Sequence, residues 1–275
     1  HRDLHSFPTR RSSDLGLSQG KIFNKKQLSK LIKNLKSSYI SRGYYGIEIT
    51  ESVEIDVQNR VDVKLDINEG EVSRISSMKI NGSKIHKEKD LLDLFEIGEP
   101  DFFILNYFTE KDHYSKIALD AGIEAMKSLY TGTGYLDFKI NKIDTNLSDD
   151  KKSITVDIQI SEGALYKIGD IKFTGDLLNQ SINDLRNLLI IAKDDVFQQK
   201  KIVKSIQAIT DVFADQGYAF AKINTITSEN KKNHTIALNI NVDLNRKVYV
   251  NRIIITGNTR TQDEVIRREI GLSEG

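Results

Sequence analysis

The apolar residues of this chain alternate between helical spacing and strand spacing, and the alternation recurs along the chain. Helical spacing runs up to Gly134-Tyr135, strand spacing continues along a hairpin that ends at Glu162-Gly163, and a new strand leads to Gly175. Similar passages surround Gly43-Tyr44 and Gly217-Tyr218, so the three Gly-Tyr pairs lie 91 and 83 residues apart. Repeats of this length are typical of small independent domains, and they predict a string of such domains.

Each complete repeat contains the same order of elements, which is a strand, two helices and two further strands. This order predicts an α+β fold in which a three-stranded mixed sheet is covered by two helices on one face. We expect the C-terminal part of one domain at residues 16–72, complete domains at 73–164 and 165–249, and the N-terminal part of a further domain at 250–275. Little chain separates consecutive units, so we expect the joints between them to bury little surface and to bend.

Capping residues predict where the helices start and stop. Asn24 is expected to cap a helix that ends before Gly43, and Thr109 is expected to cap a longer helix that ends near Gly134. A Thr-x-x-Glu capping box at residues 261–264 predicts the start of the last helix.

Residues 1–15 share no pattern with the rest of the chain. They resemble translated vector or adapter sequence, and we expect them to be a non-native leader. On this interpretation a native signal peptide would be missing from the sequence.

The predicted sheet has a strand edge that could bind another chain. The hairpin pairs the third strand of a unit with the second, and the first strand pairs on the other side, so the second strand is left at an edge. Unpaired N–H and C=O groups at such an edge can add an extended peptide, while edge lysines limit aggregation. In the second unit the predicted partner-binding edge consists of Phe138, Lys139, Ile140, Asn141, Lys142 and Ile143.

Composition and motifs exclude several other kinds of chemistry. The charge is nearly balanced at +1, which does not favour binding to nucleic acid, and the chain has no cysteine. His86, His113 and His234 fall in three different elements without metal-ligand spacing. Gly132 and Gly134 flank Thr133 at the C-terminal end of a predicted helix. A phosphate-binding loop would instead precede a helix, so these glycines do not indicate one. We therefore predict no catalytic residue, cofactor or metal, and no apolar run is long enough for a membrane helix.

The repeated motifs resemble those of a known family. The helix-terminal Gly-Tyr, the V-x-V-x-I-x-E-G third strand and the I-x-x-x-G-N opening together resemble a POTRA domain. The run I-T-G-N-T-R-T-Q-D-E-V-I-R-R-E at residues 255–269 and the serial arrangement over residues 16–275 resemble the family of outer-membrane β-barrel assembly factors. The third unit departs from the pattern, because Asp243-Leu244-Asn245-Arg246 stands where Glu-Gly would fall.

The resemblance implies a function and a set of partners. It implies a non-enzymatic scaffold at the periplasmic face of the outer membrane, which docks assembly lipoproteins and guides unfolded outer-membrane proteins by strand addition. It also implies attachment to the outer membrane through a C-terminal barrel that these residues do not include. In that family the fifth POTRA domain contacts a partner lipoprotein, and the matching charged residues here are Arg267, Arg268, Glu269 and Glu274.

Other functions remain open on the sequence alone. Within the same family, the chain could belong to a two-partner secretion transporter or a TamA-like protein. An RNA-binding KH module shares a βααβ core, but it needs a G-x-x-G clamp between its helices, and residues 190–199 contain no glycine. An enzyme is the third class, and no constellation of residues supports it.

Overall fold

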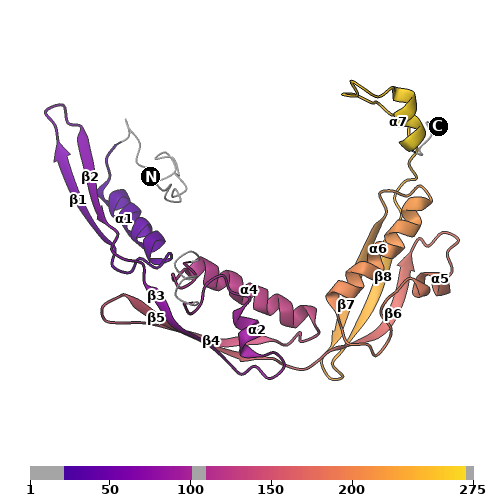
Figure 1. Ribbon diagram of the computed structural model, residues 1–275, viewed down its shortest axis with the longest axis horizontal. Coiled ribbons are helices and arrows are strands. Elements are labelled where there is room, and N and C mark those ends of the chain that lie inside the picture. The colour runs from indigo at the N-terminus through magenta and orange to yellow at the C-terminus, as the bar shows by residue number, and fades with distance from the viewer. Residues whose placement is uncertain (1–21, 101–109, 271–275) are drawn as a thin grey trace. The chain divides into compact units, whose positions relative to one another are not determined.

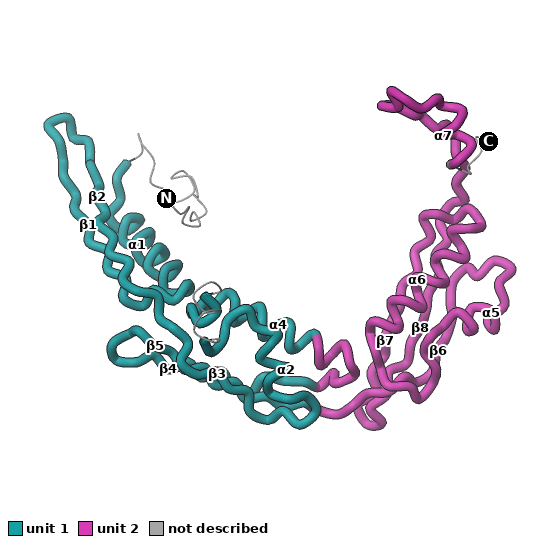
Figure 2. The backbone as a smooth tube through the Cα atoms, viewed as in Figure 1, with its two compact units in different colours: residues 1–128, 138–162 teal, residues 129–137, 163–275 magenta. Residues whose placement is uncertain are grey.

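The computed structural model describes residues 22–100 and 110–270. The chain divides into two compact units (Figure 2). Unit 1 comprises residues 1–128 and 138–162, and unit 2 comprises residues 129–137 and 163–275. The end of one long helix and the turn that follows it therefore belong to unit 2.

The elements follow the predicted order (Figure 1). Residues of unit 1 form α1 (Lys25–Ile40), β1 (Glu48–Ile55), β2 (Val61–Asn68), β3 (Arg74–Asn81), α2 (Glu88–Leu92), most of α4 (Lys116–Gly132), β4 (Lys139–Leu147) and β5 (Ser153–Ser161). Residues of unit 2 form the end of α4, then β6 (Lys167–Gly175), α5 (Ile182–Asn187), α6 (Gln199–Asp215), β7 (Lys222–Asn230), β8 (Thr235–Asp243) and α7 (Asp263–Ile270).

The sheets confirm the predicted fold class. Unit 1 contains the β1–β2 hairpin and a mixed sheet in the order β3-β5-β4, and unit 2 contains a mixed sheet in the order β6-β8-β7. In both mixed sheets the central strand is parallel to the first strand and antiparallel to its hairpin partner. Helices lie on one face of each mixed sheet (Figure 1). Every second residue of β5 and β8 is buried, because alternate side chains of a strand point to opposite faces.

The Gly-Tyr motif ends a long helix in the same way three times. At Gly43 the backbone has φ 91°, its N–H donates to Ile40 O, and the next N–H, of Tyr44, donates to Tyr39 O. This Schellman motif needs a left-handed residue, which glycine adopts without steric cost. Tyr44 then packs edge-on against Tyr39 at 5.8 Å between ring centroids. Gly134 and Gly217 have the same conformation and the same two hydrogen bonds.

One departure from the repeated sequence pattern has a simple physical explanation. In the first two repeats the turn after the last strand contains Gly70 and Gly163, with φ 71° and 76°. Asn245 occupies this turn after β8 with φ 56°. Asparagine tolerates the left-handed region better than most residues, so the turn forms without glycine.

Two predicted helix starts are wrong, and one is confirmed. Asn24 caps α1, since its Oδ1 accepts from Lys26 N at 2.9 Å. Thr109 lies outside the described residues, and α4 begins only at Lys116, after a segment whose backbone binds the start of β3. Helix α7 begins at Asp263 with the Gln262 carbonyl accepting its first hydrogen bonds, one residue later than the capping box predicts.

Candidate docking edges

Strand β4 lies at an edge of its sheet, where the sequence places it. Within the described residues its paired strand is β5. The predicted binding residue Phe138 precedes the strand and is buried, whereas Lys139 to Ile143 lie within it. Lys142 pairs with Asp144 at 2.8 Å between Nζ and Oδ2.

A β-bulge interrupts this predicted edge. The register of β4 against β5 shifts between Ile140 and Lys142, which leaves Asn141 as the extra residue. The bulge explains why Ile140 and Ile143, three residues apart, both oppose buried isoleucines of β5. An incoming strand needs a regularly repeating row of backbone groups, and the regular part of this edge begins at Lys142.

A second edge lies on β7, and sequence reasoning did not single it out. Strand β7 pairs with β8 without a register shift from Lys222 to Asn230. Its backbone therefore presents a continuous edge nine residues long. On the outer face Ile226 is 61% exposed, whereas Ile223 and Thr225 face the helix side and are partly buried.

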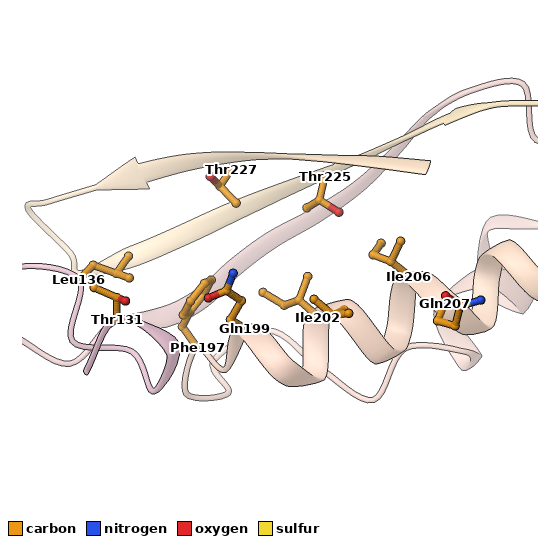
Figure 3. Close-up of a pocket in the computed structure, with 10 residues that line it drawn as sticks. Thr131, Leu136, Phe197, Gln199, Ile202, Ile206, Gln207, Thr225 and Thr227 are labelled. Carbon is orange, nitrogen blue, oxygen red and sulfur yellow. The ribbon is translucent and has the colours of Figure 1, made fainter. Parts of the chain in front are cut away.

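An apolar groove of about 480 Å³ lies between β7 and α6 in unit 2 (Figure 3). The Thr225 hydroxyl Oγ1 is buried there and has no hydrogen-bond partner among the described residues. Strand β7 has threonines at alternate positions, whereas β8 has large apolar residues at alternate positions. This difference is the feature of the sequence that could have indicated the groove. The groove is lined by Thr131, Leu136, Phe197, Gln199, Ile202, Val203, Ile206, Gln207, Thr225 and Thr227.

Hydrogen bonds to the Gly-Tyr turns join successive repeats. The glycine carbonyl of each turn accepts an N–H from the residue that starts the following repeat. Ser73 and Tyr166, two of these donors, are fully buried, and Tyr166 lies in a core cluster with Ile168 and Phe197 of its own repeat. The bending of these joints stays a prediction. The three bonds are Ser73 N to Gly43 O at 2.9 Å, Tyr166 N to Gly134 O at 2.8 Å, and Val248 N to Gly217 O at 2.9 Å.

Tyr166 adds a polar contact to the second joint. Its hydroxyl lies 2.6 Å from Glu229 Oε1 and 2.9 Å from Asp137 Oδ2. The hydrogen bond with Glu229, followed by burial and the bond with Asp137, raises the pKa of Tyr166 above its usual range. The ring packs edge-on against His234 at 5.4 Å. Tyr166 therefore holds three segments of unit 2 together.

The predicted lipoprotein-docking residues are only partly brought together. Arg267 Nη2 donates to the Ile253 carbonyl at 2.8 Å. Arg268 and Glu269 form an exposed pair at 3.5 Å. Glu274 lies outside the described residues. The docking role of these residues stays a prediction.

The described part of the chain contains no group of three or more His, Cys, Asp or Glu residues that could hold a metal ion. In residues 22–100 and 110–270, no helix has the length and apolar character to cross a bilayer. The polar features of the site are backbone edges, and the apolar feature is a groove beside one of them.

The fold and these edges define the chain as a tandem array of small βααββ modules, whose edge strands β4 and β7 each pair with one strand among the described residues. A family model named POTRA and described as "Surface antigen variable number repeat" matches residues 11–70, 73–163, 166–244 and 248–275. The chain belongs to the POTRA family.

Named relatives agree with this assignment. The outer membrane protein assembly factor BamA of Neisseria meningitidis serogroup B is 28% identical over 255 residues, covering 93% of this chain and 32% of the relative. BamA of Buchnera aphidicola is 32% identical over 261 residues, covering 95% of this chain and 42% of the relative. The chain thus spans less than half the length of either relative.

A solved structure has the same fold. The crystal structure of Haemophilus influenzae BamA POTRA3-5 superposes with a TM-score of 0.53 at 23% identity, covering 74% of this chain and 78% of that one. The predicted resemblance to POTRA domains of outer-membrane assembly factors is therefore confirmed.

Proposed function

We propose that this chain is a non-enzymatic periplasmic scaffold of the machinery that assembles outer-membrane β-barrels. It docks assembly lipoproteins and guides unfolded outer-membrane proteins by strand addition. The observation that carries this proposal is the open strand edge, which in unit 2 lies beside an apolar groove. The BamA relatives, named as assembly factors, support the same role.

An unfolded outer-membrane protein has the chemistry that such an edge recognises. Strands of outer-membrane barrels alternate apolar and polar residues. A segment paired with the edge would bond through its backbone and place every second side chain against the groove. Backbone bonding is independent of sequence, so one edge can serve many clients.

The two edges differ in how well they suit this role. Strand β4 has a bulge at Asn141, whereas β7 is regular over its whole length. The groove beside β7 also offers Ile202, Val203 and Ile206 of α6 to apolar client side chains. We propose β7 as the stronger client edge and the regular part of β4, from Lys142 to Leu147, as the weaker one.

Val203→Asp is expected to weaken the binding of an unfolded client segment by about tenfold or more. Val203 lines the groove and is 61% exposed, so the substitution places a charge in the apolar contact with little effect on packing. Binding of a synthetic barrel strand of about ten residues to the 275-residue chain, measured by fluorescence anisotropy, checks this.

Ile182→Asp is the matched control. Ile182 lies in α5, is 48% exposed, and is not among the residues that line the groove. Its peptide affinity should equal that of the unmodified chain. Equal affinities for both aspartate variants would remove the groove from the client site.

Glu274→Lys and Arg267→Glu, each in the full-length protein, are expected to weaken capture of the cognate assembly lipoprotein. Charges at the edge of an interface act mainly through the association rate, so the salt dependence of capture should fall as well. Arg246→Glu makes the same charge change as Arg267→Glu at an exposed position before the last module, and it serves as the control. Unchanged pull-down for both test variants would exclude these residues from the interface.

A further inference from the structure

The sheet of unit 1 has two edges, and side-chain carboxylates occupy one of them. Strand β3 is the edge opposite β4. Its Met78 N–H donates to Glu99 Oε1 at 3.1 Å, and its Ile80 N–H donates to Glu88 Oε1 at 2.9 Å. Glu88 begins α2, and Glu99 follows that helix. The two carboxylates therefore reach the strand from different segments.

The start of β3 is bonded as well. Ile75 N–H donates to the Asp112 carbonyl at 2.6 Å. The register of β3 shifts between Ile75 and Ser77, which explains why the outward donors are Ile75, Met78 and Ile80 and not every second residue. The N–H groups of β3 that point away from β5 therefore already have acceptors within the chain.

Glu88 and Glu99 make no ion pair among the described residues. Both lie in exposed positions, where a carboxylate would otherwise be hydrated. In unit 2, the corresponding strand β6 receives no carboxylate on its outer N–H groups within the described range; there the Ile168 N–H bonds to the Asp195 carbonyl. The Glu88 and Glu99 side chains, here called the carboxylate caps, are thus a feature of the sheet that contains β4.

We infer that Glu88 and Glu99 close the β3 edge, so that strand addition to this sheet is confined to β4. The inference rests on the proposed function, because it specifies which edge of one sheet accepts a client. An added strand needs the Met78 and Ile80 N–H groups as donors, and both already make charge-assisted bonds. The carboxylates also repel the carbonyl oxygens of an incoming strand. Protection of an edge by charge is a known way to prevent edge-to-edge association.

The test uses the 275-residue chain and a synthetic peptide of about ten residues that alternates valine and threonine and carries a central photoreactive group. Crosslinked residues are located by mass spectrometry. The unmodified chain should crosslink outside β3. The Glu88→Ala/Glu99→Ala variant should gain crosslinks within β3, or should self-associate through it in sedimentation velocity. Amide exchange at Met78 and Ile80 should accelerate by about tenfold or more, because a hydrogen bond to a charged acceptor is lost.

Two control variants distinguish the effect of the acceptor oxygens of the carboxylate caps from the effect of their negative charge. Glu88→Gln/Glu99→Gln keeps an acceptor oxygen at each position and should keep β3 closed. Glu96→Ala/Glu124→Ala removes the same charge from two exposed positions and should behave as the unmodified chain. If the double alanine variant loses its folded structure, Glu99→Ala alone replaces it, because Glu99 is outside any helix.

The outcomes distinguish this inference from the proposed function. Faster exchange at Met78 and Ile80 without new crosslinks or self-association would overturn the inference. New β3 association in the glutamine variant would overturn the role of the acceptor oxygen. Absence of crosslinks to β4 and β7 in the unmodified chain would overturn the proposed function, while opening of β3 in the alanine variant would still support the caps.

Discussion

Tyr166→Ala is expected to lower the free energy of unfolding of unit 2 by about 3–5 kcal/mol. Tyr166 is fully buried and packs in one cluster with Ile168 and Phe197. The substitution removes this aromatic packing and leaves the Asp137 and Glu229 carboxylates without the hydroxyl. Hydrogen exchange followed by mass spectrometry resolves the loss to unit 2.

Two further substitutions make this result specific. Tyr166→Phe removes only the hydroxyl and is expected to cost about 1.5–3 kcal/mol, the range for a hydrogen bond to a charged group. Tyr249→Ala removes a tyrosine that is 76% exposed and should change stability by no more than about 0.5 kcal/mol. Equal stabilities for Tyr166→Ala and Tyr249→Ala would contradict the assigned role of Tyr166.

Gly43→Ala is expected to destabilise unit 1 by about 3 kcal/mol. Gly43 has φ 91°, and a Cβ added there would lie 2.4 Å from the Tyr114 carbonyl oxygen. Both the strained backbone and this overlap disturb the bond that Gly43 O accepts from Ser73 N–H. Urea unfolding monitored by circular dichroism, with hydrogen exchange to locate the change, measures the effect.

Gly132→Ala provides the matched control for this glycine. Gly132 is the last residue of α4, and a Cβ added there meets nothing within 4 Å. Alanine is the better helix former by about 1 kcal/mol, so this substitution should be neutral or stabilising. A Gly43→Ala variant as stable as Gly132→Ala would show that the first joint tolerates a side chain.

The sequence predicts the order of elements and the sheet topology because both depend on short-range patterns. Alternation in β5 and β8 marks strands buried on one face, and helical spacing in α6 marks a helix that covers them. The stop of each long helix is equally local, since the left-handed glycine and its two hydrogen bonds involve only neighbouring residues.

The sequence predicts less of the candidate site than of the fold. The edge position of β4 follows from hairpin connectivity, but the bulge at Asn141 does not, because it depends on how β4 and β5 align. The groove beside β7 arises from residues as distant as Thr131 and Thr227, which no local pattern connects. The start of α4 does not follow from the sequence for a similar reason, since residues 112–114 bond to the start of β3 instead of joining the helix.

The sequence by itself determined the repeat, the class of each element and the glycine turns that end the long helices, because burial periodicity and backbone sterics are local properties. Only the tertiary structure decided that β4 has a bulge, that β7 is regular and that carboxylates bind N–H groups of β3. Glu99 Oε1 accepts from Met78 N–H, and the Tyr166 hydroxyl bonds to Glu229, which is 63 residues away in the sequence. Such contacts depend on how the elements pack and on hydrogen-bond geometry. No short segment of the sequence determines the packing or the geometry.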